Sequence, residues 1–240
     1  AYALREPDPE RMRETLRAIV GQLSRSRRLS EQLLALAHAS EPQEDVTSSA
    51  LVDLNALARE VVLQYLPLAH EKNQDLGWVH AYGDNAQADV GMAPAATGAG
   101  ATADMVAPVM AHGEELHEAL SNLVHNAVAY TPAGGTITVA TRFEGLSVCV
   151  EVCDNGPGIA ADQRAAVFER FVQLAEHAVP GAARHGAGLG LSIARGYAQR
   201  NGGDIELADA DTPADGPRGL RAILRLPRAT IPAARSASAG

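Results

Sequence analysis

Apolar side chains recur every three or four residues in several parts of the chain, the spacing that places them on one face of an α-helix. This pattern predicts helices over residues 10–39, 53–70, 114–130, 160–168 and 190–200. Asp53 is a suitable N-cap for the second helix, because its side chain can accept a hydrogen bond from the first turn. The stripe on helix 10–39 has coiled-coil spacing, so we expect this helix to pair with others.

Short apolar runs bounded by turn residues predict the strands of the fold. They lie at 135–143, 146–153, 203–208 and 219–226, and a turn at Glu144–Gly145 joins the first two. Because strands and helices follow one another along the chain, we expect an α+β fold. Its form would be a two-layer α/β sandwich, one mixed sheet backed by helices, preceded by a helical segment.

Changes in composition divide the chain into three parts. Residues 1–45 are the helical segment, 46–228 the α/β domain, and 229–240 a tail that we expect to be disordered. Within the domain, residues 83–105 are mainly Ala, Gly and polar residues, which predicts a mobile insertion. The chain starts without methionine and in the middle of a pattern, so we expect a fragment of a longer protein.

Charge and cysteine content narrow the function classes. The net charge is −9, Lys72 is the only lysine, and no basic run offers a surface for nucleic acid. Cys149 and Cys153 lie four residues apart on one side of a predicted strand, which makes a disulfide between them unlikely and favours a reducing, cytoplasmic setting. No apolar run approaches the roughly 18 residues of a membrane helix, so we expect no membrane contact within this chain.

Two asparagines interrupt the apolar pattern of "ALSNLVHNAVAYTP", residues 119–132. Asn122 and Asn126 are one helical turn apart and therefore project in nearly the same direction. Asparagine is a poor helix former, because its side chain competes for backbone hydrogen bonds. Either the pair faces water or it holds something polar.

Glycine-rich segments follow a predicted strand and precede a predicted helix. In "DNGPGIA", Asp154 stands at a strand end before Gly156 and Gly158, where a carboxylate could accept a hydrogen bond from an amine such as that of adenine. A plain turn is the alternative. In "HGAGLGLSIARGY", three glycines precede a helix whose free amides could meet a phosphate, with a flexible hinge as the alternative.

The order of these motifs along the chain is specific. The asparagine pair, D-x-G-x-G, then "FERF" at 168–171 and G-x-G-L-G-L together resemble the catalytic and ATP-binding domain of sensor histidine kinases, in the superfamily of gyrase and the mismatch-repair ATPases. The resemblance covers residues 114–226, while residues 10–80 resemble the second helix of the dimerisation and phosphotransfer domain with its connector. It implies a Bergerat-type fold that uses ATP and Mg²⁺.

The resemblance also implies roles for individual residues. Asn126 would coordinate Mg²⁺ through its side-chain oxygen, and Asn122 would lie beside the phosphates. Tyr130 would flank the adenine ring, and Asp154 would bind its amino group. The remaining site residues would shape the purine wall, or anchor and close an ATP lid at roughly 172–187: Gly156, Gly158, Ile159, Phe168, Phe171, Gly186, Gly188, Leu189 and Gly190.

The reaction implied is phosphoryl transfer. Asn122 stands where ATP-hydrolysing relatives carry a glutamate that activates water, so the site favours transfer over hydrolysis. The phosphate would pass to a histidine outside this chain, since none of the eight histidines fits a phosphoacceptor motif, and then to an aspartate of a response regulator. The full-length protein would be a homodimer through its helical segment, and this chain the cytoplasmic part of an inner-membrane sensor.

Two other functions remain open on the sequence. One is a degenerate ATP-binding or interaction module without phosphotransfer, favoured by Ala129 where the family usually carries a basic residue. The other is a serine-directed anti-sigma kinase of the same superfamily, against which helix 10–39 argues.

Overall fold

The computed structural model describes residues 49–82, 106–174, 187–210 and 218–229, all of them within the compact unit Pro42–Gly240. Several predictions therefore lie wholly or mostly outside the described residues: helix 10–39, the insertion 83–105, the ATP lid at roughly 172–187 with Gly186, and the tail 229–240 beyond Ala229.

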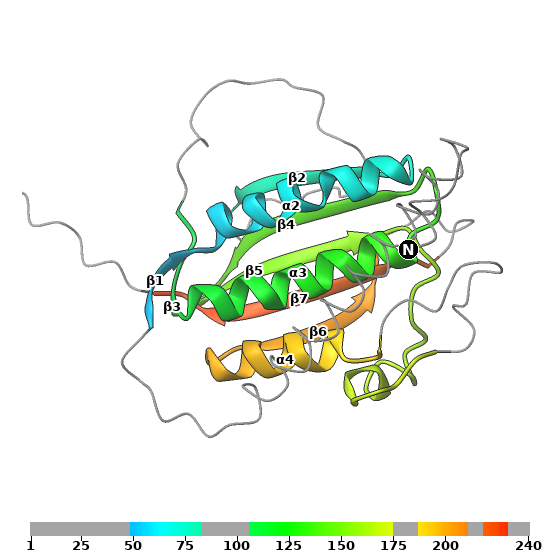
Figure 1. Cartoon of the computed structure of the whole chain (residues 1–240). Helices are drawn as coiled ribbons and strands as arrows, with labels where there is room; N and C mark the ends of the chain where they lie inside the picture. The colour runs from blue at the N-terminus through cyan, green and yellow to red at the C-terminus, as the bar shows by residue number, and fades with distance from the viewer. Residues whose placement is uncertain (1–48, 83–105, 175–186, 211–217, 230–240) are drawn as a thin grey trace, which may run out of the picture. The chain divides into compact units, whose positions relative to one another are not determined.

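In the part of the chain that the structure describes, five strands form one mixed sheet behind the helices (Figure 1). Their order is β2-β4-β5-β7-β6, and only the pairing of β2 with β4 is parallel. The strands are β2 (Asp75–Tyr82), β4 (Thr136–Glu144), β5 (Ser147–Asp154), β6 (Asp204–Asp209) and β7 (Leu220–Pro227). The four predicted strands are thus found within one residue at either end, whereas β2 was not predicted.

Three helices cover one face of this sheet (Figure 1). They are α2 (Leu54–Glu71), α3 (Gly113–Tyr130) and α4 (Gly190–Arg200). Their apolar sides meet the sheet in a core whose largest fully buried side chains include Leu54, Leu116, Leu120, Ile137, Leu189, Ile193 and Leu224. The predicted α+β sandwich is therefore confirmed. Among the described helices, none is long and apolar enough to cross a membrane.

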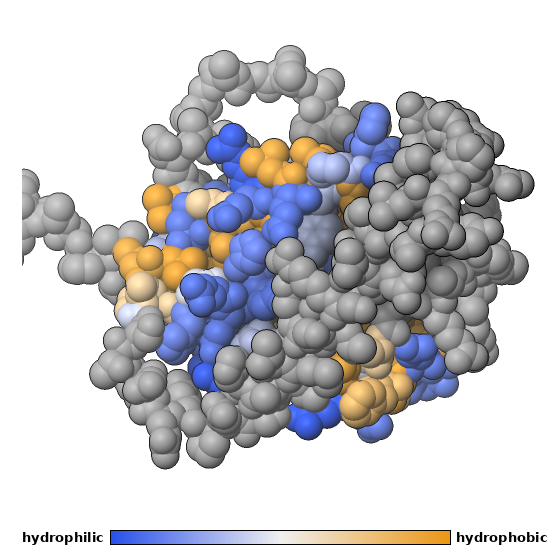
Figure 2. All heavy atoms as spheres, viewed as in Figure 1, coloured by the Kyte–Doolittle hydropathy of each residue, from blue (hydrophilic) through white to orange (hydrophobic). Residues whose placement is uncertain are grey.

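A separate pair of strands, one before α2 and one before α3, lies outside the five-stranded sheet. β1 (Ala50–Asp53) runs antiparallel to β3 (Pro108–Ala111), and neither was predicted. Figure 2 shows apolar residues gathered over this pair, where the register partners Leu51 and Met110 are 55% and 53% exposed. Asp53 ends β1 and caps α2 as predicted, accepting hydrogen bonds from the backbone amides of Asn55 (3.0 Å) and Ala107 (2.9 Å).

The helix predicted over 160–168 is wrong. Only the 3₁₀ turn η2 (Ala166–Phe168) is helical there, and the preceding residues form turns. Val167 is the one buried side chain of residues 160–168, so too little apolar surface is available to stabilise a short helix. On β5, Cys149 and Cys153 form no disulfide with each other.

Candidate functional site

The two asparagines of α3 face the start of α4. A Cβ atom added at Gly190 would lie 3.2 Å from Oδ1 of Asn122 and 3.7 Å from the terminal atoms of Asn126. Asn122 is buried, and its Nδ2 donates to the carbonyl oxygen of Glu118 at 3.0 Å, which fixes the carboxamide. The pair on α3 and the glycine-rich segment before α4, separated widely in the sequence, thus form one site.

The first turn of α4 offers uncapped backbone amides. Leu189 occupies the N-cap position, is fully buried, and makes no side-chain cap, and the first turn contains no acidic residue. Gly188 precedes it with φ +71°, and a Cβ atom there would lie 2.7 Å from the carbonyl oxygen of Val172. A helix N-terminus in this condition attracts anions, because its N–H groups and its dipole both favour negative charge.

The loop after β5 packs against the C-terminal end of α3, one turn beyond Asn126. The backbone amide of Gly156 donates to Oδ1 of Asp154 at 2.9 Å, and a Cβ atom at Gly156 would lie 3.2 Å from the carbonyl oxygen of Tyr130. Gly158 has φ +70°, and a Cβ atom there would lie 2.6 Å from the carbonyl oxygen of Gly219. The two glycines are therefore required for the close approach of three chain segments.

Asp154 is a buried carboxyl group. It is 8% exposed, and its burial raises its pKa from 3.8 to about 6, although hydrogen bonds from the amides of Gly156 and Leu220 lower it. No ion pair to Asp154 is found among the described residues. Such a group costs free energy when it is ionised in the folded protein, and a ligand that donates a hydrogen bond would relieve that cost.

Two residues that sequence reasoning missed hold the C-terminal end of α3. Nζ of Lys72 donates to the carbonyl oxygens of Val128 (2.7 Å) and Ala129 (3.1 Å). Nε2 of Gln74 donates to the carbonyl oxygens of Val128 (3.1 Å) and Thr131 (2.7 Å). These donors satisfy carbonyl groups that a helix end leaves without intrahelical partners. A signal was present, since Lys72 is the only lysine of the chain and follows the predicted helix.

The predicted ring residues differ in their packing. Tyr130 lies beside the loop that follows Asp154, and its side chain is 36% exposed. Partial burial of this side chain raises the pKa of its phenol group. Phe168 is half-buried with the guanidinium of Arg195 over its ring. The side chain of Phe171 is instead 66% exposed, and its backbone amide donates to the carbonyl oxygen of Gly188 at 2.9 Å.

Ile159 helps to hold the loop after β5 through its backbone, because its carbonyl oxygen accepts a hydrogen bond from Nε of Arg164 at 3.0 Å. Its side chain is half-buried. The structure thus brings the predicted site residues that it describes to two places, the start of α4 and the loop after β5, and both places contact α3.

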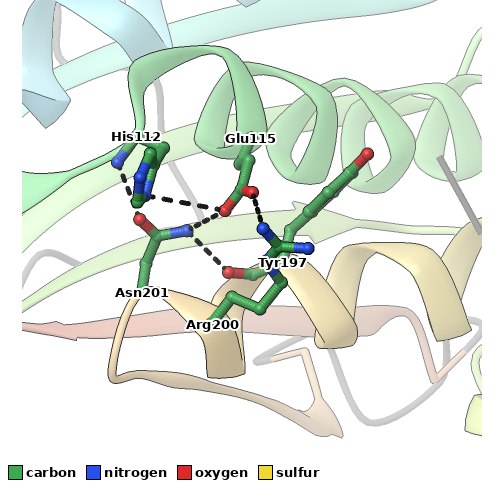
Figure 3. A network of polar contacts seen from close by, with 5 residues as sticks. All are labelled: His112, Glu115, Tyr197, Arg200 and Asn201. Carbon is green, nitrogen blue, oxygen red and sulfur yellow. Dashed lines mark hydrogen bonds and ion pairs between the residues drawn. The ribbon is translucent and has the colours of Figure 1, made fainter. Parts of the chain in front are cut away.

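The opposite ends of α3 and α4 are joined by a polar network (Figure 3). Oδ1 of Asn201 accepts from the backbone amide of His112 at 2.8 Å. Nδ2 of Asn201 donates to Oε2 of Glu115 and to the carbonyl oxygen of Tyr197, both at 2.8 Å. Arg200 forms an ion pair with the other oxygen of Glu115 at 3.0 Å. The start of α3 at this end also lacks a side-chain cap, but its first turn carries the acidic residues Glu114 and Glu115.

Comparison with known proteins agrees with this geometry. Residues 111–230, half of the chain, match the family described as histidine kinase-, DNA gyrase B- and HSP90-like ATPases. The chain belongs to this family, and within it the fold and motifs define a domain of the sensor histidine kinase type.

Several curated relatives share this character. The chain is 29% identical over 215 residues to the swarming motility regulation sensor protein RssA of Serratia marcescens, covering 89% of this chain and 39% of the relative. It is 38% identical over 137 residues to the sensor protein KdpD of Rathayibacter rathayi, covering 50% of this chain and 16% of that protein. The chain therefore spans well under half the length of these relatives, whose names do not favour the two alternative functions.

Solved structures show the same fold. The catalytic domain of histidine kinase ThkA superimposes with a TM-score of 0.56 at 23% identity, covering 75% of this chain and 95% of that one. Full-length ShkA in complex with AMPPNP gives a TM-score of 0.66 at 25% identity, covering 93% of this chain and 40% of that one. The predicted family resemblance is confirmed.

Proposed function

We propose that this chain is the ATP-binding kinase portion of a sensor histidine kinase. It would transfer the γ-phosphoryl group of Mg-ATP to a histidine outside the chain, and a response-regulator aspartate would receive it next. The observation that carries the proposal is the contact of Gly190 with Asn122 and Asn126, which sets an uncapped helix start beside two carboxamides.

The two parts of the site suit the two ends of ATP. Asp154 would accept a hydrogen bond from the adenine amino group, with Tyr130 beside the ring and the glycine loop forming the wall. The triphosphate would lie at the start of α4, where the amide groups and helix dipole favour negative charge. Asn122 and Asn126 would hold the phosphate end from the side of α3.

The donor set fits magnesium. Mg²⁺ prefers oxygen ligands and keeps several waters and substrate phosphates in its shell, so it needs few protein ligands. Among the described residues there is no group of three or more His, Cys, Asp or Glu side chains that could hold a metal ion alone. The oxygen of Asn126, together with the nucleotide's own phosphates, would supply the site, and the ion would neutralise phosphate charge during transfer.

The residue at position 122 favours transfer over hydrolysis. A carboxamide cannot take a proton from water, and its Nδ2 is already bound to the carbonyl oxygen of Glu118. The site would therefore position ATP and leave the attack to a nucleophile brought from outside.

Two structural neighbours support the partners of the reaction. The ShkA structure contains AMPPNP, and a structure of ThkA, 24% identical with a TM-score of 0.62, is a complex with the response regulator TrrA. By analogy, this chain would bind a nucleotide and act with a response regulator. Dimerisation through residues 1–45, and attachment to an inner-membrane sensor with this chain in the cytoplasm, belong to the same proposal.

Thermal unfolding with and without Mg-ATP tests the nucleotide site. A ligand at about 100 times its Kd should raise the free energy of unfolding by about 2.7 kcal/mol. Asn126→Ala should abolish this gain while keeping the fold. Equal melting temperatures with Mg-ATP and with buffer would show that the site binds no nucleotide.

Phosphoryl transfer needs a second assay. The chain would be joined to a histidine-kinase helix carrying the acceptor histidine, incubated with labelled ATP, and examined for acid-labile phosphate. Nucleotide binding without any labelled histidine would leave a binding module and refute the kinase.

A further inference from the structure

Phe168 of η2 and Arg195 of α4 form a cation–π contact at the edge of the proposed phosphate site. The guanidinium carbon of Arg195 lies 4.7 Å from the ring centroid of Phe168. A guanidinium at this distance is attracted to the negative face of an aromatic ring. The contact joins the F-x-R-F motif to the helix that starts at Gly190.

Asp204 of β6 fixes the orientation of Arg195. Nε of the arginine donates to Oδ1 of Asp204 at 2.8 Å, and its NH2 group donates to Oδ2 at 2.9 Å. This bidentate geometry sets the plane of the guanidinium group, and the face of the guanidinium remains in contact with the ring of Phe168. A lysine could supply the charge but neither the plane nor the paired hydrogen bonds.

A second link joins the same two parts of the chain through the backbone. The amide of Phe171 donates to the carbonyl oxygen of Gly188 at 2.9 Å, and both residues have positive φ, +68° and +71°. A Cβ atom at Gly188 would lie 2.8 Å from the carbonyl carbon of Phe171. The backbone at Phe171 therefore passes close to the backbone at Gly188, and only glycine fits at position 188.

The two links lie on either side of the start of α4. Its N-cap, Leu189, makes no side-chain cap, so no hydrogen bond of that kind sets the direction of the first turn. The side-chain link at Arg195 and the backbone link at Gly188 act on either side of Gly190, which contacts Asn122. Loss of the first link would leave the amides of α4 free to shift relative to the asparagines.

We propose that Arg195, oriented by Asp204 and stacked on Phe168, is a positioning residue for the phosphate-binding start of α4. The inference rests on the proposed function. It differs from a simple attraction between Arg195 and phosphate, because it depends on the planar stack and not on the charge alone. It also predicts that the adenine end, which is built on β5, does not respond to the contact.

Isothermal titration of the full chain with Mg-ATP, and separately with adenosine, tests the proposal. Arg195→Met and Phe168→Leu should each weaken Mg-ATP binding about five- to tenfold, the size expected for a partly desolvated cation–π contact. Adenosine binding should stay within about twofold of the wild type in both variants, since adenosine carries no phosphate. The double variant should bind no more weakly than either single variant, because each removes the same contact.

Three further variants separate stacking from charge and from general loss of stability. Phe168→Tyr keeps the ring face and should bind Mg-ATP like the wild type. Arg195→Lys keeps the charge and should bind as weakly as Arg195→Met. Arg200→Met is the matched control: it removes an arginine–carboxylate pair from the other end of the same helix and should leave Mg-ATP binding unchanged.

The outcomes are decisive in each case. Three results would overturn the inference and leave the proposed function standing. They are an unchanged ratio of ATP to adenosine affinity in Arg195→Met, wild-type Mg-ATP affinity in Arg195→Lys, and a loss of Mg-ATP affinity in Arg200→Met equal to that in Arg195→Met. A wild-type chain that binds no Mg-ATP would overturn the proposed function and the inference with it. If Arg195→Met fails to fold, the pair Phe168→Leu and Phe168→Tyr gives the same decision.

Discussion

The two ends of the α3–α4 pair satisfy their polar groups in opposite ways. At one end, the side chain of Asn201 makes three hydrogen bonds, and Glu115 is shared between Asn201 and Arg200 (Figure 3). At the other end, α4 starts with neither a side-chain cap nor the acidic first-turn residues that α3 carries, and the buried Asp154 is held only by backbone donors among the described residues. The first end is satisfied by groups of the protein itself, whereas the second is where we propose that the nucleotide binds. We therefore expect stability and binding to depend on opposite ends of this pair of helices.

The largest expected effect comes from making the same substitution, Asn to Ala, at each end of the α3–α4 pair. Asn201→Ala should lower the free energy of unfolding by about 3 kcal/mol, because it leaves several partly buried partners without hydrogen bonds. For a domain of this size the melting temperature should fall by roughly 6–12 °C. Asn126→Ala should cost under about 1 kcal/mol of stability and remove the response to Mg-ATP. Calorimetry with and without nucleotide measures both effects.

This comparison can fail in two ways. Loss of the Mg-ATP response in Asn201→Ala, measured at a temperature where the variant is folded, would show that the far end contributes to binding. Strong destabilisation by Asn126→Ala would show that the open end is also structural. Either result would contradict the expectation that one end of the helix pair serves stability and the other serves binding.

Asp154 gives the next largest effect, and its sign follows from the raised pKa. The folded protein holds the proton more tightly than the unfolded chain, with a pKa of about 6 against 3.8. The contribution of Asp154 to stability is thus greatest below pH 4 and falls by up to about 3 kcal/mol as the pH rises past 6. Asp154→Asn should therefore raise the free energy of unfolding at pH 7.5 by about 1–2 kcal/mol. Denaturant unfolding at pH 7.5 and pH 5 should show this gain shrinking at the lower pH.

Ligand binding should depend on pH in the opposite direction. The ionised carboxylate is the better acceptor for the adenine amino group, so adenosine affinity should fall about tenfold between pH 7.5 and pH 5. Adenosine is the suitable probe because it has no phosphate that titrates in this range. A flat pH profile in the wild type, or binding that survives in Asp154→Asn, would show that this carboxyl does not contact the base.

Lys72 provides the smallest effect. Lys72→Met keeps most of the aliphatic stem but removes the donors to the carbonyl oxygens of Val128 and Ala129, and should cost about 1 kcal/mol of stability. Lys72→Arg should recover about half of this loss, since a guanidinium can reach the same carbonyl groups with different geometry. Chemical unfolding curves of the three proteins measure the change. Full stability of Lys72→Met would mean that Gln74 alone holds this helix end.

Elements with a clear local signal were predicted well. Helices α3 and α4 and strands β4 and β5 lie within one residue of their predicted bounds, because apolar periodicity and the turn at Glu144–Gly145 are local features. Strand β2 was missed, since it pairs with β4 from a distant part of the sequence and carries no turn signal of its own. The helix expected at 160–168 failed because only Val167 of this stretch is buried, and a short helix with so little apolar surface to pack forms only turns and η2.

The sequence by itself determined the amphipathic elements, the order of the motifs and therefore the family of the domain. Only the tertiary structure decided that Gly190 lies against Asn122, that Arg195 stacks on Phe168, and that Lys72 donates to the end of α3. Periodicity describes what a residue does within its own element. Contacts between elements depend on how helices pack on the sheet, and no local pattern encodes that packing.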